Sequence, residues 1–214
     1  MIIIPAILVK NESDYLQQIN SIKNSVNLAQ IDIGDGDFVP KTWADPEVIK
    51  NNTEIDLELH LMVNHPLEEL KKWVGIEQVR RVLVHYECQD DLMSVSDFID
   101  SNGWEKGIVI NPETPISALD EYLDDFTHIL FMSVHPGKQN QKFIPETINK
   151  IIEFKKNNPE HFVEVDGGIN EETLSEIVRA NPDGLCIGSA ILCRNTSPAE
   201  QIKYFENLVN SLTN

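Results

Sequence analysis

Two aspartates stand out because each lies at the end of a short apolar run and shortly before a glycine. Asp32 belongs to the run 29–33, which Gly34 ends, and Asp166 ends the run 162–166 before Gly167. Carboxylates transfer protons in catalysis and also bind divalent cations. If both runs are parallel strands of one barrel, both carboxylates point into its mouth. We therefore expect the protein to hold Asp32 opposite Asp166.

A histidine joins this pair from a third apolar run, residues 55–63. Strand alternation places Glu58, His60 and Met62 on one face and the intervening leucines on the other. If the leucines face covering helices, His60 faces the barrel interior. Read alone, His60 is more often a hydrogen-bonded core histidine, and Asp32 a helix cap or a solvated loop residue. Together with Asp166 they suggest a divalent metal site or an acid–base pair.

The elements that must position these residues alternate between strand-type runs and helix-type patterns along the whole chain. Eight such units of roughly 25 residues, without a Gly-, Pro- or Ser-rich linker, favour a closed (β/α)₈ TIM barrel. This single domain would span residues 1–214, and an open doubly wound sheet is the runner-up. The strands are expected at 2–8, 27–33, 55–63, 79–85, 107–110, 127–133, 162–165 and 184–187, and the helices at 11–22, from Pro66, and at 92–99, 116–123, 146–156, 171–179 and 198–212.

Glycines follow the last two predicted strands. Barrels of this kind often hold a phosphate there, because bare backbone N–H groups close around an anion. Gly167, Gly168, Gly188 and Ser189 would form that cradle. The alternative is that these glycines only turn the chain.

The charge and the chain start restrict the partners. A formal net charge of −18 argues against binding to nucleic acid or to an anionic membrane, whereas a small anionic substrate still fits a local donor pocket. The three cysteines lack metal-type spacing. No basic residue precedes the apolar start, and Lys10 interrupts it, so we expect a cytoplasmic protein without a membrane span. Barrel enzymes are often oligomeric, which leaves a homo-oligomer open.

Six short motifs occur in order along nearly the whole chain. They are DIGDGDFVP at 32–40, HLMV at 60–63, NPETP at 111–115, MSVHPG at 132–137 continuing to QKFIP at 141–145, VDGGI at 165–169 and GSAI at 188–191. Each is weak alone, but the ordered set is specific. The set resembles that of the ribulose-phosphate 3-epimerase family.

The resemblance implies proton abstraction at C3 of a ketose phosphate, most simply the conversion of D-ribulose 5-phosphate to D-xylulose 5-phosphate through an enediolate. It implies Asp32 and Asp166 as the acid–base groups and, with His60, as ligands of one divalent metal (Mn²⁺, Mg²⁺, Zn²⁺, Fe²⁺ or Co²⁺) that stabilises the enediolate. Met62 and Met132 would keep water from that intermediate. The implied substrate-binding residues are Ala6, His60, Met62, Met132, Gly137, Lys138, Gln141, Gly167, Gly168, Gly188 and Ser189.

Several positions depart from the family pattern. Gln30 stands where the family has a histidine ligand, Ala6 where it has a serine, and Gly34 where it has a methionine. The loop 136–141 lacks the two glycines of the family's Pro-Gly-Phe-Gly-Gly-Gln, although Lys138 could supply a point charge to a phosphate or stay solvated.

Three interpretations follow from these departures. The first is a working epimerase with three protein ligands, with the Gln30 oxygen as a doubtful fourth, which favours Mn²⁺ or Mg²⁺ over Zn²⁺. The second is an enzyme for another sugar phosphate, and the third is a catalytically impaired protein that binds a sugar phosphate. Because both candidate proton-transfer groups are present, we favour an enzyme.

Other barrel chemistries fit worse. A Schiff-base aldolase needs a lysine inside the barrel, and Lys106 lies at the wrong end of its strand. Related decarboxylases and hexulose-phosphate synthases need Asp-x-Lys where this chain has Glu58-Leu59-His60.

Overall fold

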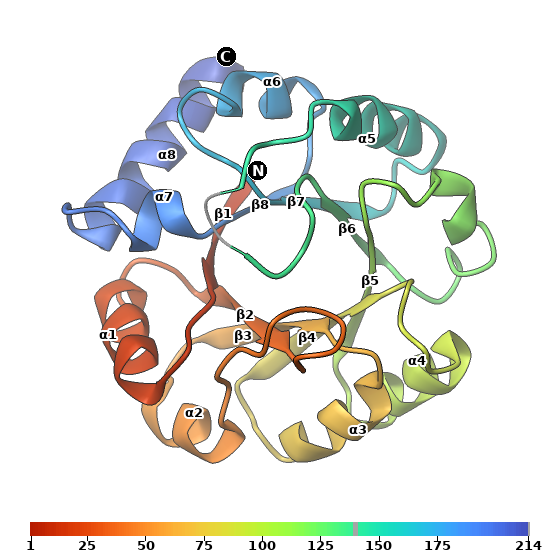
Figure 1. Cartoon of the computed structure of the whole chain (residues 1–214). Coiled ribbons are helices and arrows are strands. Elements are labelled where there is room, and N and C mark those ends of the chain that lie inside the picture. The colour runs from red at the N-terminus through yellow and green to blue at the C-terminus, as the bar shows by residue number, and fades with distance from the viewer. Residues whose placement is uncertain (139–140, 214) are drawn as a thin grey trace.

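Eight parallel strands close into one barrel in the computed structural model, which describes residues 1–138 and 141–213 (Figure 1). Each strand pairs with its neighbour in sequence, and the last strand pairs with the first, Ile2 lying opposite Gly184. This confirms the predicted (β/α)₈ TIM barrel, and the open sheet is wrong. The strands are β1 (Ile2–Ile7), β2 (Leu28–Gly34), β3 (Asp56–Met62), β4 (Val79–His85), β5 (Glu105–Ile110), β6 (His128–Met132), β7 (Phe162–Asp166) and β8 (Gly184–Ile187).

Helices surround the barrel, and short polar side chains set several of their starts (Figure 1). Asn11 accepts a hydrogen bond from the backbone N–H of Asp14, and Asp91 accepts one from that of Ser94. The helices are α1 (Glu12–Ile22), α2 (Pro46–Asn52), α3 (Pro66–Leu70), α4 (Leu92–Ser101), α5 (Glu146–Asn157), α6 (Leu174–Arg179), α7 (Ser189–Leu192) and α8 (Pro198–Thr213), with 3₁₀ turns η1 (Lys71–Trp73) and η2 (Ile116–Leu119).

Three helical segments differ from the sequence expectation, one of them the short α7, which was not predicted. The helix predicted at 116–123 is wrong, because only η2 forms there. Pro115 precedes this segment and makes no side-chain capping hydrogen bond, so nothing offsets the unpaired N–H groups of a first helical turn. Conversely, α2 was not predicted, although Asp45 caps it and Pro46 opens it.

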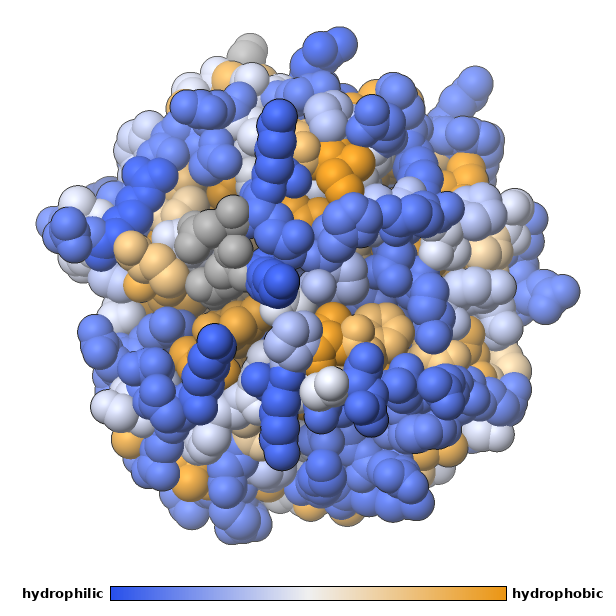
Figure 2. Space-filling view, viewed as in Figure 1, coloured by the Kyte–Doolittle hydropathy of each residue, from blue (hydrophilic) through white to orange (hydrophobic). Residues whose placement is uncertain are grey.

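The surface on the side viewed in Figure 1 is mostly hydrophilic, in keeping with the net charge of −18, and apolar residues show near its middle (Figure 2). Across residues 1–138 and 141–213, we find no helix that is both long enough and apolar enough to cross a bilayer.

Strand alternation divides β3 as predicted. Leu57, Leu59 and Leu61 are fully buried in the main apolar core between the sheet and the helices. His60 instead contacts Asp32 within the barrel. A second, smaller apolar cluster, which includes Ile4, Leu83 and Cys186, lies inside the barrel. The interior is therefore only partly apolar, and polar side chains of β2, β3 and β7 share it.

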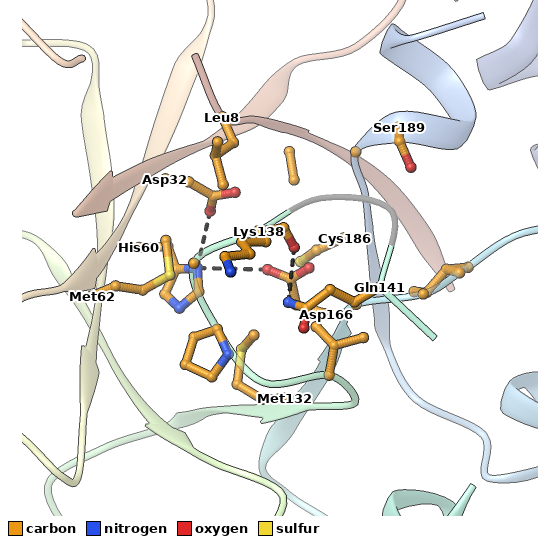
Figure 3. Close-up of a pocket in the computed structure, with 18 residues that line it drawn as sticks. Leu8, Asp32, His60, Met62, Met132, Lys138, Gln141, Asp166, Cys186 and Ser189 are labelled. Atoms are coloured by element: carbon orange, nitrogen blue, oxygen red, sulfur yellow. Dashed lines mark hydrogen bonds and ion pairs between the residues drawn. The ribbon is translucent and has the colours of Figure 1, made fainter. Parts of the chain in front are cut away.

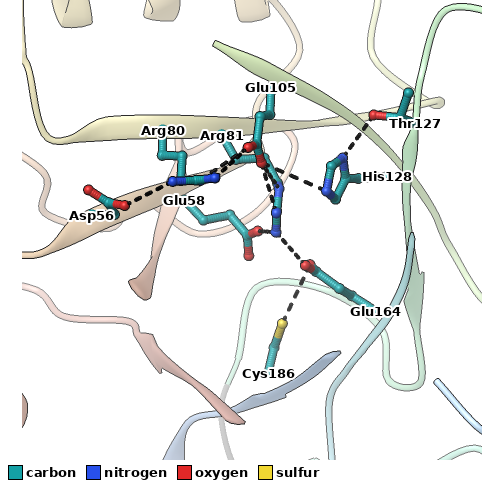
Figure 4. Close-up of polar contacts among 9 residues, drawn as sticks. All are labelled: Asp56, Glu58, Arg80, Arg81, Glu105, Thr127, His128, Glu164 and Cys186. Carbon is teal, nitrogen blue, oxygen red and sulfur yellow. Dashed lines mark hydrogen bonds and ion pairs between the residues drawn. The ribbon is translucent and has the colours of Figure 1, made fainter. Parts of the chain in front are cut away.

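A charged layer lies one strand repeat below Asp32, His60 and Asp166 and depends on one guanidinium (Figure 4). Nη1 of Arg81 lies 2.7 Å from Oε2 of Glu58 and 2.6 Å from Oε1 of Glu164, and both glutamates are fully buried. Nη2 of Arg81 also donates to Glu105 at 2.9 Å. Burial raises the pKa of Glu58 and of Glu164, and the Arg81 charge opposes the shift in both. Without Arg81, two buried carboxylates would repel each other.

We expect Arg81→Met to lower the free energy of unfolding by about 3–5 kcal/mol at pH 7.5, because it leaves buried charges unpaired. The loss should shrink near pH 5. The folded pKa of each glutamate lies above its unfolded value of about 4.3, and removal of the opposing Arg81 charge raises it further. The folded variant therefore binds more protons than the folded unmodified protein, so its stability falls more steeply as pH rises. Denaturant titrations at both pH values measure this difference.

Arg80→Met is the matched control, because the Arg80 side chain is 54% exposed and pairs with Asp56 and Glu105 at the surface. Its loss should stay below about 1 kcal/mol. An equal loss in both variants, or a loss from Arg81→Met that does not change with pH, would contradict the description of this layer.

Candidate active site

The ends of β2, β3 and β7 bring Asp32, His60 and Asp166 together (Figure 3). Asp32 lies opposite His60 in the strand register. Nδ1 of His60 lies 3.0 Å from Oδ1 of Asp32 and 3.5 Å from Oδ2 of Asp166. The candidate ligand atoms of the three residues all lie within 4.8 Å of one another. The three predicted metal-binding residues therefore form one cluster.

Gln30 occupies the middle of this cluster through its side-chain nitrogen. Nε2 donates to Oδ1 of Asp32 and to Oδ2 of Asp166, at 2.7 Å in each case, and lies 3.3 Å from Nδ1 of His60. Oε1 of Gln30 is buried and has no hydrogen-bond partner among the described residues. The amide thus faces both carboxylates with its donor group.

Burial of like charges shifts the proton affinities of the cluster. Burial, followed by the charge of Asp32, raises the pKa of Asp166 to about 7. Burial alone would lower the pKa of His60, but its hydrogen bond to Asp32 and the charges of Asp32 and Asp166 outweigh burial, so that the pKa is raised. Near neutral pH, the Asp166 carboxyl can therefore carry a proton that it can donate.

A hydrogen-bonded chain behind His60 orients its ring. Nε2 of His60 lies 2.9 Å from Nε2 of His85, and Nδ1 of His85 lies 3.2 Å from Oε2 of Glu87. Burial lowers the pKa of His85 to about 4, so His85 is neutral and its Nδ1–H donates to Glu87. Nε2 of His85 then accepts from His60. Glu87 is fixed in turn by the backbone N–H of Asn111 at 2.9 Å and by the Thr114 hydroxyl.

His85 and Glu87, at the end of β4, were not among the site residues predicted from the sequence. The signal that could have found them is the strand order, because β3 and β4 are neighbours and His85 is one residue beyond the last register pair, Leu61 and Val84.

All the predicted substrate-binding residues line one cavity at this mouth, together with Leu8, Val134, Pro136, Ile169 and Cys186. Figure 3 places Ser189 across the cavity from His60. The cavity therefore has an acidic end, formed by Asp32, His60 and Asp166, while Ser189 lies on the opposite side and glycines contribute to the lining. Its walls between these ends include Met62 and Met132, which are 2% and 3% exposed.

Glycine is required at the turn that follows β7. Gly167 and Gly168 have φ of +116° and +64°, a region that side chains rarely adopt. A Cβ on Gly168 would lie 2.9 Å from the backbone N and Cα of Phe143. The turn therefore presents bare backbone to the cavity.

Gly137 and Gln141 shape the loop over the cavity. A Cβ on Gly137 would lie 2.6 Å from Cβ of Val39, so this loop packs on the segment after β2. Nε2 of Gln141 donates to the backbone oxygens of Lys138 and His135. Gln139 and Asn140, which stand where the family has its two glycines, lie outside the described residues.

Two further sequence observations have structural explanations. A Cβ on Gly34 would lie 2.7 Å from the backbone oxygen of Pro40 and from Val39, so no larger residue fits this loop. Nζ of Lys106 contacts Asp100 and Ser96 of α4, outside the barrel. That position agrees with the exclusion of Schiff-base chemistry.

We expect the stability of the metal-free protein to fall as pH rises from about 5 to 7 and to level off above about pH 8. The folded pKa of Asp166, about 7, lies above the unfolded value of about 3.9, so the folded state binds more protons until its own pKa is passed. Urea unfolding in chelator should show this slope, and Asp166→Asn should reduce it. The same slope in both proteins would contradict the assignment.

The family model and the curated relatives that match this chain carry the same family name. The sequence model of the Ribulose-phosphate 3 epimerase family matches residues 2–192. Curated proteins named ribulose-phosphate 3-epimerase are 33% identical over 178 residues in Aquifex aeolicus (80% of each chain) and 35% identical over 179 residues in Chlamydia muridarum (79% of this chain, 78% of that one). The Escherichia coli K12 protein of that name is 32% identical over 77% of this chain and 76% of its own.

Solved structures agree with the fold. KGPDC from Streptococcus mutans in complex with D-R5P superposes with a TM-score of 0.74 at 12% identity, covering 98% of this chain and 97% of that one. 3-Hexulose-6-phosphate synthase from Salmonella typhimurium gives a TM-score of 0.72 at 14% identity, covering 99% and 100%. At these identities the likeness shows the barrel alone. The sequence relatives show more: the chain belongs to the ribulose-phosphate 3-epimerase family.

Proposed function

We propose that the chain interconverts D-ribulose 5-phosphate and D-xylulose 5-phosphate by proton transfer at C3. The observation that carries this proposal is the meeting of Asp32 and Asp166 at one cavity, where the pKa of Asp166 is about 7. Inversion beside a carbonyl needs a base on one face of the carbon and an acid on the other. Asp166, when protonated, would supply the acid, and Asp32 would supply the base from the same cavity.

The proposed reaction balances with these two groups. In one direction, Asp32 takes the C3 proton, and the electrons of the broken C–H bond form the enediolate. The protonated Asp166 then gives its proton to the opposite face of C3. In the reverse direction the two aspartates exchange these functions.

His60, Asp32 and Asp166 would also hold the divalent metal that members of the family bind. Cis ligands about 2.1 Å from one cation lie about 3 Å apart, and the two His60–aspartate separations are 3.0 and 3.5 Å. Three donors of mixed oxygen and nitrogen type suit Mn²⁺, Fe²⁺, Co²⁺ or Zn²⁺, and Mg²⁺ with added water. When bound, such an ion supplies a Lewis acid for the substrate carbonyl.

Met62 and Met132 would exclude water from the reacting carbon, because both thioethers are buried in the cavity wall. Ala6 also lines the cavity and, unlike the serine of the family pattern, has no hydroxyl that could bind the substrate. The backbone at Gly167, Gly168 and Gly188, with the Ser189 hydroxyl, would bind the phosphate at the far end, where N–H groups can face the anion.

A second candidate is the same chemistry on another sugar phosphate. The departures at Ala6 and Gln30, and in the loop that carries Lys138, lie in or around the cavity, so they bear on which ketose fits. A protein that only binds the sugar phosphate would keep the phosphate end and lose turnover.

Solvent exchange tests the proposal. In heavy water, deuterium should enter C3 of D-ribulose 5-phosphate in the presence of the enzyme and Mn²⁺ or Zn²⁺, as followed by proton NMR. Asp166→Asn and Asp32→Asn should each lower the rate of epimerisation by about 10² to 10⁴, the usual contribution of a positioned acid or base. Binding of ribitol 5-phosphate, which lacks the carbonyl, should change less than about threefold.

Exchange with another ketose phosphate alone would favour the second candidate. If no ketose phosphate exchanged at any metal loading, the remaining interpretation would be a protein that binds a sugar phosphate without turnover. If Asp166→Asn also abolished binding of ribitol 5-phosphate, Asp166 would be structural and the proposed acid–base function would be wrong.

Lys138 gives a separate test of the phosphate end, because it lines the cavity and is exposed. We expect Lys138→Ala to raise KM about tenfold and to change kcat less than threefold, since hydrogen bonds to charged groups contribute about 1.5–3 kcal/mol. Lys142→Ala is the control, because Lys142 does not line this cavity. Equal effects of the two variants would show that Lys138 acts only through general charge.

A further inference from the structure

Gln30 is the residue in this site whose chemistry the family pattern does not explain. Its side chain lies inside the barrel, fully buried, and touches all three members of the candidate metal cluster. An amide has one end that only donates hydrogen bonds and one that only accepts them. Which end faces the cluster decides whether Gln30 can bind a cation there.

The surrounding charges determine the orientation of the amide. Oδ1 of Asp32 and Oδ2 of Asp166 are acceptors, and both lie 2.7 Å from the same atom of Gln30. An amide oxygen at that point would place three acceptor oxygens in contact, whereas the NH₂ group supplies one N–H to each carboxylate. The nitrogen therefore faces the aspartates.

The opposite end of the amide carries a cost that the contacts of Nε2 must offset. Oε1 of Gln30 is buried and lacks a hydrogen-bond partner in the described part of the chain. A buried acceptor without a partner has a free-energy cost, so the gain at Nε2 must outweigh it. Hydrogen bonds to charged acceptors are about twice as strong as neutral ones, and Nε2 makes two of them.

We infer that Gln30 is not a metal ligand but a donor that bridges the two acid–base carboxylates and thereby weakens the site's hold on a divalent cation. The inference takes from the proposed function the assignment of Asp32, His60 and Asp166 as ligands. The N–H groups already neutralise part of the charge that would attract a cation. They also hold both carboxylates in place without one, so Gln30 acts as a positioning residue.

Two variants of Gln30 separate a donor from a ligand. Gln30→Leu removes the amide, and Gln30→His restores the family's nitrogen ligand. Calorimetric titration with MnCl₂ and with ZnCl₂, without substrate, gives the metal affinity of each protein. Gln30→His should bind at least about tenfold more tightly than the unmodified protein, and Gln30→Leu at least as tightly as it.

The opposite results would overturn the inference. If Oε1 were a ligand, Gln30→Leu would lose about tenfold or more in affinity. If Gln30→His bound Mn²⁺ and Zn²⁺ no more tightly than the unmodified protein, the Gln30 amide would not be what limits the metal affinity. Because no substrate is present, a failure of C3 exchange would refute the proposed function and leave these affinities unaffected.

Gln78→Leu is the matched control. Nε2 of Gln78 also makes two hydrogen bonds, to the backbone oxygens of Lys50 and Thr53, and its Oε1 likewise has no partner among the described residues. It lies away from the cavity. Metal affinity should change less than about twofold in this variant, which separates a local effect from general loosening of the fold.

The unmodified protein provides a test if the Gln30 variants fail to fold. In crystals grown with Mn²⁺, Nε2 should stay within hydrogen-bond distance of both carboxylates. A distance of about 2.2 Å between Oε1 and the ion would show ligation and contradict the inference. Chelation should also lower the thermal midpoint of the unmodified protein less than that of Gln30→His, and an equal or greater drop would count against it.

Discussion

The close approach of two carboxylates, those of the buried Asp32 and the partly buried Asp166, is the constraint on which the rest of the site depends. Two like charges in a poorly solvated place need a proton, a donor or a cation between them. In this chain Gln30 supplies N–H groups to both, and His60 lies 3.0 Å from one and 3.5 Å from the other. The raised pKa of Asp166 is the remaining consequence, and it is the property that a proton donor near neutral pH requires.

The layer below meets the same constraint by another means. Glu58 and Glu164 are as deeply buried as any residues of the chain, and Arg81 bridges them. Cys186 joins these glutamates in a second group of metal-type donors, but the Arg81 guanidinium already lies between the two carboxylates. The barrel therefore contains two acidic layers. In the lower layer Arg81 pairs with the carboxylates, and in the upper layer the carboxylates line the cavity.

Much of this arrangement could be predicted from the sequence. The period-2 alternation of β3 placed His60 inside the barrel, and the alternation of strand and helix patterns indicated the fold. The family resemblance of six ordered motifs implied the residues that line the cavity. The His85–Glu87 chain was not predicted, because it depends on contacts between neighbouring strands. The orientation of the Gln30 amide depends on three side chains that are distant in sequence. The helix expected at 116–123 was wrong because its start lacks a capping side chain, which the apolar spacing does not reveal.

A direct titration of the carboxyl groups tests the central claim that Asp166 keeps its proton up to about pH 7. Carbon-13 NMR of the metal-free protein, labelled at the aspartate carboxyls, should show one signal that titrates near pH 7. That signal should vanish in Asp166→Asn and move to lower pH in Asp32→Asn, because the neighbouring charge is then gone. If every aspartate carboxyl titrates below about pH 5, as in unperturbed side chains, the account of the site is wrong.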